Sequence, residues 1–406
     1  MPMYDAIVVG ARCAGSPTAM LLARAGHRVL LVDRARFPSD TFRAHFVRAP
    51  AVRYLQNWAL LDRVLATGCP LVRKRTSDLG DFRLAGYPPG FDDVPGDLAP
   101  RRIVLDAILV EAAVAAGAEL REAFAVEDVI WDGDRVVGVR GRADGRVFEE
   151  RARIVIGADG QYSLVARRVG AAVRCATPPL TFAYYSYWAE MPVEGIEVVH
   201  RPDAGCAFIT FPTNDGLSVV GMQARMAQFA AWRRDVEGRF QEALELVPEL
   251  NDRVRAGRRV ADWRGSGDLP NFIRAAWGPG WALVGDAGYH RDPLPAQGIS
   301  DAFRDASALA EAVHAGLAGI RSIESAISEF EARRDAAALA GYEATVRACA
   351  LNGPSPELLR LRAALRGNQA DTDRFYGVDY GTVPRDEFYA PANIARILCA
   401  DVAQSR

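Results

Sequence analysis

Hydrophobic and polar positions near the start of the chain follow the pattern of a strand, a turn, a helix and a second strand. Residues 4–10 (YDAIVVG) form a short apolar run that ends in glycine, and residues 15–25 (GSPTAMLLARA) carry apolar side chains at helical spacing. Gly26 stops this helix, and residues 27–33 (HRVLLVD) form a second apolar run that ends in an acid. Two apolar runs joined by a helix within about 30 residues predict a βαβ unit with parallel strands.

The same alternation of apolar runs and amphipathic segments continues along much of the chain. Glycine and aspartate turns separate these segments, as in other α/β proteins. The pattern predicts strands at 124–130, 135–141, 153–157 and 281–285, and helices at 103–116 and from about 298 onward.

A different pattern occupies residues 180–225. Runs such as TFAYYSYWAEM, GCAFITFP and GLSVVGMQA are separated by turn residues, which favours an antiparallel sheet. Helical sequence returns at 227–247, and the last part of the chain is helical apart from a Pro/Gly break at 352–356. We therefore expect a Rossmann-like α/β domain built from residues 1–80, 100–178 and 275–345, an antiparallel-sheet substrate domain built from 81–99 and 179–274, and a helical C-terminal region at 346–406.

Composition restricts the class of protein. Of 406 residues, 50% are hydrophobic and 25% charged, and the net charge is -2, so we expect a globular protein with no nucleic-acid partner. No apolar run reaches the length of a membrane span, about 18 residues. The six cysteines are scattered without histidines at metal-ligand spacing, so no metal site is expected. Without a secretion signal at the N-terminus, this cysteine pattern favours a reducing compartment, the cytoplasm.

The turn after the first strand resembles a dinucleotide-binding fingerprint with one unusual residue. Gly10 and Gly15 occupy its first and last glycine positions, but Arg12 stands where a glycine normally lets the backbone approach a pyrophosphate. Its guanidinium could contact a phosphate or a nearby ligand group instead. Asp33 ends the second strand, where an acid binds the ribose hydroxyls. The cofactor-binding residues expected here are Gly10, Arg12, Cys13, Ala14, Gly15, Asp33 and Arg34.

Two later stretches complete a recognisable set. Residues 157–163 (GADGQYS) and 281–306 (WALVGDAGYHRDPLPAQGISDAFRDA) each follow a strand and precede a helix. Either stretch alone is typical of an ordinary strand-to-helix connection. In this order with the first turn, they resemble the FAD-dependent group A monooxygenase superfamily, which includes p-hydroxybenzoate hydroxylase, geranylgeranyl reductases and flavin-dependent halogenases. The resemblance implies a Rossmann-like FAD-binding domain with an inserted antiparallel substrate domain and a helical C-terminal region.

The resemblance also implies roles for residues in the later stretches. Asp159 and Gly160 would lie near the pyrophosphate, Gly285 and Asp286 at the ribityl chain, and Pro293 in the loop beside the flavin. Backbone N–H groups of Gly298 and Ile299 at a helix start would face the flavin edge that carries negative charge after reduction. The chain departs from the family pattern at residues 295–296, where a glycine usually precedes Gln297.

Further residues are carried over from the resemblance by position. Arg43 and Arg102 match arginines that contact the cofactor, and Val126 matches a backbone contact to the adenine. Their alternatives are a solvated arginine and an ordinary β-core residue. His45 and His290 are expected near the flavin ring, where a histidine could act as a general acid or base.

The inserted sheet is expected to cover the flavin and line the substrate site. Side chains alternate along a strand, so Tyr184 and Trp188 share one face and Tyr187 lies on the other. With Phe46 and Phe211 they are the candidate substrate contacts, although core packing explains any single aromatic equally well. Such a lining suits a planar or hydrophobic small molecule.

The function predicted from this resemblance is that of a single-component monooxygenase. NADH or NADPH would transiently reduce FAD, and O₂ would supply an oxygen atom to an aromatic or other electron-rich hydrophobic small molecule of specialised metabolism. A reductase or dehydrogenase of the geranylgeranyl reductase type stays the main alternative. A halogenase is disfavoured because no Trp-x-Trp-x-Ile-Pro segment occurs. A non-catalytic dinucleotide-binding module is the remote alternative, since it would not need Asp286 or the helix start at Gly298. A monomer or homodimer is expected.

Overall fold

The computed structural model describes residues 3–41, 45–80, 82–91, 94 and 96–404, and the chain forms two compact units. Each unit is assembled from three separated segments. Unit 1 comprises Met1–His45, Arg101–Pro178 and Pro270–Arg347, and unit 2 comprises Phe46–Pro100, Pro179–Leu269 and Ala348–Arg406. In the part of the chain that is described, no helix combines the length and the apolar character needed to cross a membrane.

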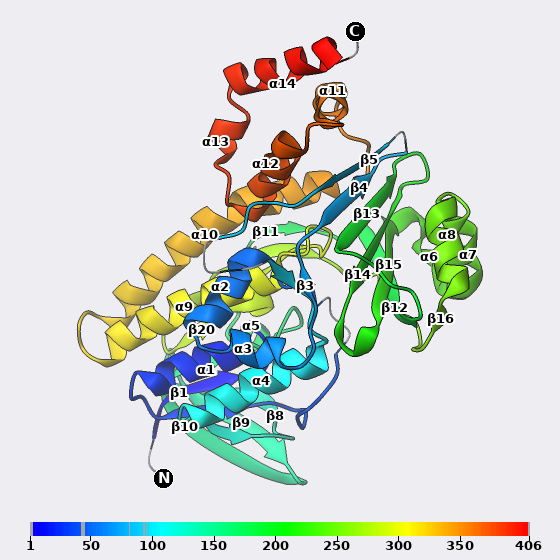
Figure 1. Ribbon diagram of the computed structural model, residues 1–406. Helices are drawn as coiled ribbons and strands as arrows, with labels where there is room; N and C mark the ends of the chain where they lie inside the picture. Colours follow the sequence, from blue (N-terminus) through cyan, green and yellow to red (C-terminus); the bar gives the residue numbers. More distant parts are fainter. Residues whose placement is uncertain (1–2, 42–44, 81, 92–93, 95, 405–406) are drawn as a thin grey trace. The chain divides into compact units, whose positions relative to one another are not determined.

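A mainly parallel sheet forms the centre of unit 1 (Figure 1). Its strand order is β19-β20-β10-β1-β2-β7, and β1 pairs in parallel with both β2 and β10. Its strands are β1 (Tyr4–Val9), β2 (Val29–Val32), β7 (Glu119–Arg121), β10 (Arg146–Gly157), β19 (Trp277–Gly278) and β20 (Trp281–Leu283). β1 and β2 are almost wholly buried, as expected for a parallel sheet covered on both faces.

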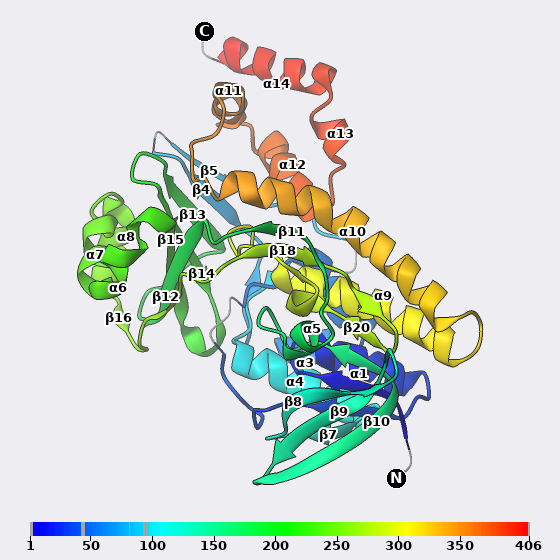
Figure 2. The same cartoon turned by 180° about the vertical axis from the view of Figure 1, so that it is seen from behind.

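Strand β10 is much longer than the strand expected at 153–157. Its first half pairs antiparallel with β9 (Arg135–Ala143), which pairs in turn with β8 (Ala125–Asp132). These strands form a ribbon that extends from the parallel sheet (Figure 2). The sequence pattern does not reveal the first half of β10, because its first four residues are all exposed and the next four include three charged side chains.

Helices of unit 1 position the candidate site. Helix α1 packs against α4 and α9, and a small sheet of three strands lies in the same unit. The helices are α1 (Gly15–Arg24), α4 (Arg102–Ala115), α5 (Leu164–Arg168), α9 (Gly298–Leu317) and α10 (Ile323–Ala348), with a 3-10 turn η3 (Gly285–Ala287). The small sheet consists of β11 (Val173–Thr177), β18 (Asn271–Arg274) and β21 (Tyr289–His290).

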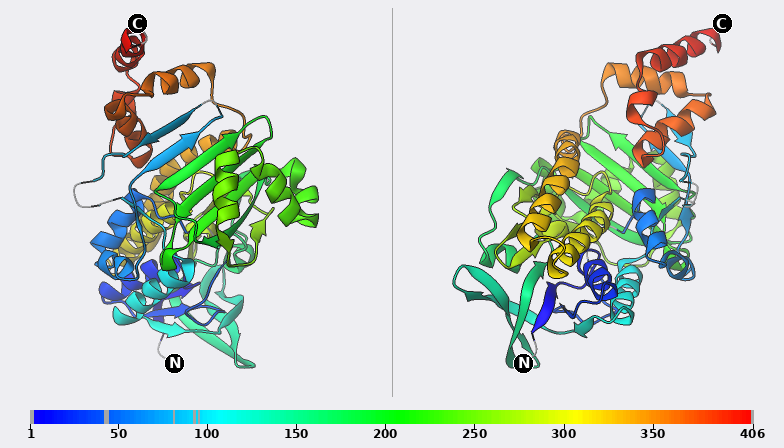
Figure 3. Two further views of the ribbon diagram at one scale, coloured as in Figure 1. Left: turned by 45° about the vertical axis from the view of Figure 1, so that its right-hand side comes forward. Right: turned by 90° about the vertical axis from the view of Figure 1, so that its left-hand side faces the viewer.

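Unit 2 is built around a largely antiparallel sheet with three helices on one face (Figure 3). The strands are β4 (Arg75–Asp78), β5 (Arg83–Gly86), β12 (Thr181–Ala189), β13 (Ile196–Arg201), β14 (Cys206–Pro212), β15 (Ser218–Arg225), β16 (Arg258–Arg259) and β17 (Arg264–Ser266), and the helices are α6 (Phe229–Arg234), α7 (Val236–Leu244) and α8 (Pro248–Ala256). Short 3-10 turns η1 (Asn214–Gly216) and η2 (Met226–Gln228) complete this region. The core between sheet and helices includes Phe182, Phe208 and Trp232.

The remaining segments of unit 2 differ from the domain boundaries expected from the sequence. Residues 46–80, expected in the dinucleotide-binding domain, belong to unit 2 because β4 pairs in parallel with β13 and antiparallel with β5. The sequence predicts a separate helical region at 346–406. Residues Ala348–Arg406 instead belong to unit 2, where their helices pack with Leu84 of β5. The elements concerned are α2 (Ala49–Asn57), α3 (Leu61–Leu65), β3 (Leu71–Val72), β6 (Asp97–Leu98), α11 (Pro356–Leu365), α12 (Gln369–Tyr380), α13 (Arg385–Phe388) and α14 (Pro391–Gln404). A short polar strand such as β4 has too few apolar residues for its sequence to indicate which strands it pairs with.

Candidate functional site

The turn between β1 and α1 is shaped by two glycines that no other residue could replace without moving the backbone. Gly10 has a φ of 103°, in the left-handed region that favours glycine. A Cβ atom added at Gly15 would lie 1.7 Å from the carbonyl oxygen of Gly10. The two glycines therefore allow the first turn of α1 to lie directly on the end of β1, as the fingerprint predicts.

The three motifs that are far apart in sequence meet at this turn. A Cβ atom at Gly10 would lie 2.5 Å from the carbonyl oxygen of Ala158, the residue before Asp159. A Cβ atom at Gly285 would lie 2.6 Å from the Cβ of Ala14. The second and third motifs thus both touch the first, so the structure brings together in unit 1 the glycine turns that the sequence predicts.

Asp33 braces the phosphate turn from the end of β2. Its Oδ2 accepts a hydrogen bond from the N–H of Ala11 (2.7 Å), and its Oδ1 accepts one from the N–H of Ala35 (2.8 Å). A carboxylate has about four lone-pair sites, so both oxygens can still accept hydrogen bonds from ribose hydroxyls. Arg34, the next residue, is exposed.

Ser16 is a site residue that the sequence reading missed. It lies in the first turn of α1 and is wholly buried, yet its Oγ has no hydrogen-bond partner among the described residues. Ala14, the N-cap, offers no side-chain cap, and the first N–H groups of a helix have no acceptor within the helix. An unpaired buried hydroxyl at the N-terminus of a helix fits the oxygens of a pyrophosphate. The serine after the last fingerprint glycine was the available signal.

Arginine side chains gather beside the same turn, around a carboxylate that the sequence reading also missed. Asp106 of α4 is wholly buried and accepts hydrogen bonds from Arg12 (Nη1, 2.6 Å) and from Arg102 (Nε and Nη2, both 3.0 Å). The thiol of Cys13 lies 3.4 Å from Asp106 Oδ1, and burial raises the pKa of this thiol to about 12. Burial alone would lower the pKa of Arg102, but Asp106 and Asp286 hold it above its usual range.

Asp286 and the start of α9 form the other half of the site. Asp286 is half-buried in η3 and makes no hydrogen bond with any described residue, although it lies within electrostatic reach of Arg102. Helix α9 begins at Gly298, which is exposed and has open space around its Cα where a side chain would stand. Its N-cap, Gln297, makes no side-chain cap, so the N–H groups of Gly298 and Ile299 have no acceptor within the helix.

The loop before α9 is held by Arg291. Its guanidinium donates to Gln297 Oε1 (2.5 Å) and to Asp301 Oδ2 (2.6 and 3.0 Å). Within this loop Ala296 has a φ of 52°, a left-handed conformation that costs a residue with a Cβ about 1–2 kcal/mol. This is the position where the family pattern has glycine, and the backbone keeps the conformation that a glycine would favour.

The second motif contains Asp159 and Gly160, which are both expected near the pyrophosphate. Asp159 accepts hydrogen bonds from Ser163 Oγ (2.5 Å) and from the N–H groups of Leu164 (2.6 Å) and Val165 (3.2 Å), so its carboxylate caps α5. Gly160 has a φ of 80° and open space beside its Cα.

Three further candidates have no described contact with the phosphate turn. Val126 is half-buried on β8, and Pro293 accepts a turn hydrogen bond from the N–H of Ala296 (2.8 Å). Arg43 lies outside the described residues. These three residues remain predictions as cofactor contacts.

The two candidate catalytic histidines are both buried. His290 on β21 is 4% exposed, its Nδ1 bonds the carbonyl oxygen of Pro270, and its ring stacks on Phe272 at a centroid distance of 5.6 Å. His45 is 1% exposed. These contacts hold His290 in the small sheet, and both histidines stay predictions as a general acid or base.

The candidate substrate aromatics separate onto the two faces of the unit 2 sheet. Tyr184 and Trp188 lie in the core beneath helices α6 and α7, where they stack on Trp232 and Phe240 at 6.3 and 6.1 Å. The interpretation of these two residues as substrate contacts is therefore wrong, because the helices cover their face.

Tyr187 and Phe211 lie on the opposite face of that sheet. Both pair with Val219 of the strand between them, so their side chains point to the same side. Phe46 packs edge-on against Phe211 at a centroid distance of 5.2 Å. Phe46 and Phe211 thus form one aromatic pair and Tyr187 lies on the same face of the sheet as Phe211, and all three stay predictions as substrate contacts.

The residues around the phosphate turn fit an FAD molecule. Such a cofactor requires anion donors for its pyrophosphate, an acceptor for its sugar and ribityl hydroxyls, and donors near its ring. The buried Ser16 hydroxyl, the carboxylates of Asp33 and Asp286, and the open helix start at Gly298 supply these groups.

Comparisons with known proteins agree with this geometry. Residues 3–343 match a family described as FAD binding domain. The chain is 29% identical over 315 residues to digeranylgeranylglycerophospholipid reductase 2 of Methanopyrus kandleri, covering 73% of each chain. Among solved structures it resembles the myxobacterial chondrochloren halogenase CndH (TM-score 0.79, 23% identity, 99% and 97% of the two chains covered) and PqsL, a probable FAD-dependent monooxygenase of Pseudomonas aeruginosa (TM-score 0.71, 21%, 93% and 99%).

Replacing Gly15 with alanine tests the assembly of the site. The added methyl group would lie 1.7 Å from the carbonyl oxygen of Gly10, so the turn must move. We expect Gly15→Ala to cost about 3 kcal/mol and to weaken FAD binding roughly 100-fold, measured by titrating the apoprotein. Gly353→Ala is the control, because its nearest atoms lie at ordinary contact distances of 3.5 Å and beyond. Equal FAD affinity in the two variants would contradict this close packing.

Replacing Ala296 with glycine tests the left-handed loop residue. Glycine adopts the left-handed conformation without the strain of alanine, but it also gives the unfolded chain more conformational entropy. The strain is the larger of the two free energies, so Ala296→Gly should raise the free energy of unfolding by up to about 1 kcal/mol. The control is Ala318→Gly at the other end of α9, where φ is -77° and the same change should cost about 0.5–1 kcal/mol. Denaturant unfolding measures both; a loss of stability in Ala296→Gly equal to that of the control would be inconsistent with a strained Ala296.

Proposed function

The chain belongs to the FAD binding domain family of FAD-dependent oxidoreductases, and from this premise we propose that it is a single-component monooxygenase of hydrophobic or aromatic small molecules. The observation that carries the proposal is the meeting of three glycine turns around one phosphate site, with Asp286 and the start of α9 left uncommitted. NADH or NADPH is the proposed reductant, O₂ the proposed oxidant, and the cytoplasm the proposed location of a monomer or homodimer.

When bound, FAD supplies the redox chemistry, accepting electrons from NADH or NADPH and passing them to O₂. The chain's own residues hold and tune it. Asp33 and Ser16 bind the ribose and pyrophosphate, and Asp286 binds the ribityl hydroxyls. The N–H groups of Gly298 and Ile299, at the positive end of a 20-residue helix, stabilise negative charge on the ring after reduction.

The substrate class is inferred from three buried aromatic side chains of unit 2. Phe46, Tyr187 and Phe211 are each less than 5% exposed and present ring surface on the sheet face opposite the helices. Aromatic rings bind planar or apolar molecules through large contact areas, and a single tyrosine hydroxyl adds one polar contact. We therefore propose an aromatic or other electron-rich hydrophobic substrate, with His45 or His290 as the candidate acid or base.

A reductase is the second candidate. It is favoured by the relative from Methanopyrus kandleri, a digeranylgeranylglycerophospholipid reductase that the chain matches over 73% of its length. A reductase would use the same FAD contacts but would pass electrons to a carbon–carbon double bond of a polyene instead of to O₂. The two functions therefore differ in their electron acceptor and not in the phosphate site.

The purified protein should carry FAD and should oxidise NADH or NADPH only when O₂ and a suitable aromatic substrate are both present. The test measures NAD(P)H and O₂ consumption against phenolic, quinoid and polyene compounds, with chloride and bromide added in parallel, and identifies products by mass. A product heavier by one oxygen atom supports the monooxygenase. A product with two added hydrogens under anaerobic conditions supports the reductase, and a halogenated product contradicts both.

Gly298→Ala tests whether α9 faces the flavin. The methyl group occupies open space in the protein, so the free energy of unfolding should hardly change, but it would displace a ring lying against the helix start. We expect about 10-fold weaker FAD binding. We also expect a midpoint potential lower by about 10–20 mV, because the ring moves away from the helix N–H groups. Redox titration of the folded variant measures this shift, with Gly353→Ala as the control. An unchanged midpoint potential and an unchanged FAD affinity would mean that the flavin ring does not lie against the start of α9.

A further inference from the structure

We propose that Asp106 is a positioning residue of the FAD site, which holds the guanidinium groups of Arg12 and Arg102 beside the phosphate turn for the pyrophosphate. The inference rests on the proposed FAD function and concerns how this chain replaces the missing glycine of its fingerprint. Asp106 lies 94 residues from Arg12 in the sequence, so only the packing of α4 against α1 brings them together.

The geometry around Asp106 is that of one buried acceptor shared by two arginines. Each of its oxygens accepts a hydrogen bond from Arg102 at 3.0 Å, and Oδ2 also accepts one from Arg12 at 2.6 Å. The Asp106 side chain is 0% exposed, that of Arg102 7% and that of Arg12 26%. Three charge-assisted hydrogen bonds to a dry carboxylate fix both guanidinium groups in place.

The charges at this cluster do not balance. Two arginines share one carboxylate, so the cluster keeps one net positive charge next to the N-terminus of α1, which is itself partly positive. The carboxylate of Asp286 lies within electrostatic reach of Arg102 and offsets part of this charge, but the hydrogen bonds to the two guanidinium groups come from Asp106 alone of the two acids. Buried or half-buried positive charge is costly unless it is paired. A pyrophosphate bound at the turn would supply the missing negative charge.

Arg12 has a second set of contacts that places it over the turn. Its Nη1 and Nη2 donate to the carbonyl oxygen and hydroxyl of Ser39 at 3.3 and 3.2 Å, and its guanidinium lies 5.4 Å from the ring centre of Phe37. The side chain therefore links the turn, α4 and the segment after β2. A glycine at this position would allow closer backbone approach but would supply neither the charge nor these links.

The test compares the FAD affinity of three variants by titrating the apoprotein. Arg12→Gly, which restores the family glycine, and Asp106→Asn should each weaken FAD binding about 10- to 100-fold, as expected for the loss of a charge-assisted contact. If Asp106 acts through the arginines, the double variant should bind FAD about as well as Asp106→Asn alone. Additive losses, or an Arg12→Gly variant that binds FAD as tightly as the wild type, would overturn the proposal.

Two further readouts separate positioning from simple stabilisation. Arg12→Lys keeps the charge and should retain most of the affinity. Added NaCl should weaken FAD binding less in Arg12→Gly than in the wild type, because one cation has been removed. Equal salt dependence in both proteins would count against a phosphate contact. These measurements use Arg12, which is partly exposed, so they hold even if Asp106→Asn does not fold.

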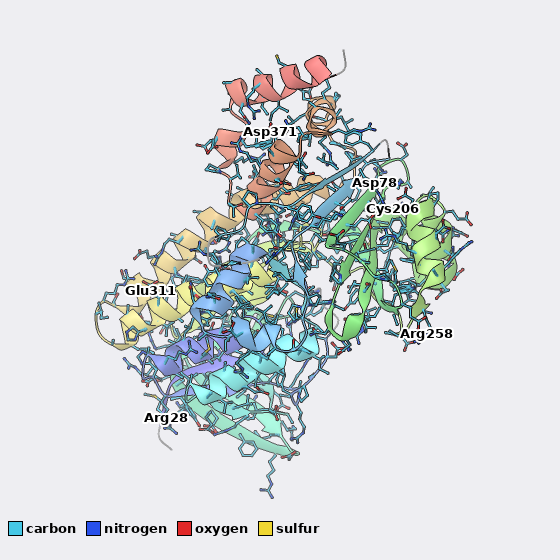
Figure 4. All side chains as sticks on the ribbon, in the orientation of Figure 1. Arg28, Asp78, Cys206, Arg258, Glu311 and Asp371 are labelled. Atoms are coloured by element: carbon cyan, nitrogen blue, oxygen red, sulfur yellow. The ribbon has the colours of Figure 1, made fainter. Side chains whose placement is uncertain are left out.

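A matched control exists in unit 2. Asp371 of α12 is also a buried carboxylate shared by two arginines, Arg396 at 2.6 Å and Arg374 at 3.6 Å (Figure 4). Asp371→Asn should lower the free energy of unfolding and leave FAD affinity unchanged. If the wild-type protein binds no FAD, the proposed function fails. If it binds FAD and the Arg12 variants match it, only the role of Arg12 and Asp106 fails.

Discussion

Backbone packing at the phosphate turn is the constraint on which the site depends. Gly15 allows α1 to lie on the end of β1, Gly10 allows the turn to touch Ala158, and Gly285 allows the third motif to touch Ala14. A Cβ atom added at any of these three glycines would lie closer to its neighbour than a real Cβ atom can. The packing therefore requires residues without a side chain. Because the three turns belong to distant parts of the chain, this packing also fixes where β10, η3 and α9 enter the site.

Charge is organised around that packing. Asp33 holds the turn from one side through the N–H of Ala11, and Asp106 holds two arginines on the other. The helix starts of α1 and α9 both lack side-chain caps. In α1 the N–H groups of Ser16 and Thr18 already donate to the carbonyl oxygens of Arg12 and Ala14, so the start of α9 is the more open of the two to an anionic ligand. The uncapped start of α9, the carboxylate of Asp286 and the two arginines bonded to Asp106 thus belong to the same unit as the phosphate turn.

Unit 2 has aromatic residues on both faces of its large sheet. The face toward α6, α7 and α8 holds Tyr184 and Trp188 in a core with Trp232 and Phe240. The opposite face holds Tyr187 and Phe211, and Phe46 packs against Phe211. The alternation of side chains along β12 separates the two groups, but only the helices decide which face becomes core.

The sequence by itself determined the βαβ unit, the phosphate turn, Asp33 and the two later glycine motifs, because these features are local. Strand periodicity, a glycine with a required conformation and an acid at a strand end all lie within a few residues of each other. Only the tertiary structure decided that residues 46–80 belong to unit 2, that Tyr184 and Trp188 are core, and that Asp159 caps a helix. It alone revealed Asp106 as the partner of Arg12 and Ser16 as an unpaired donor. Such pairings join residues tens of positions apart, and no local pattern specifies which distant side chain a buried charge will meet.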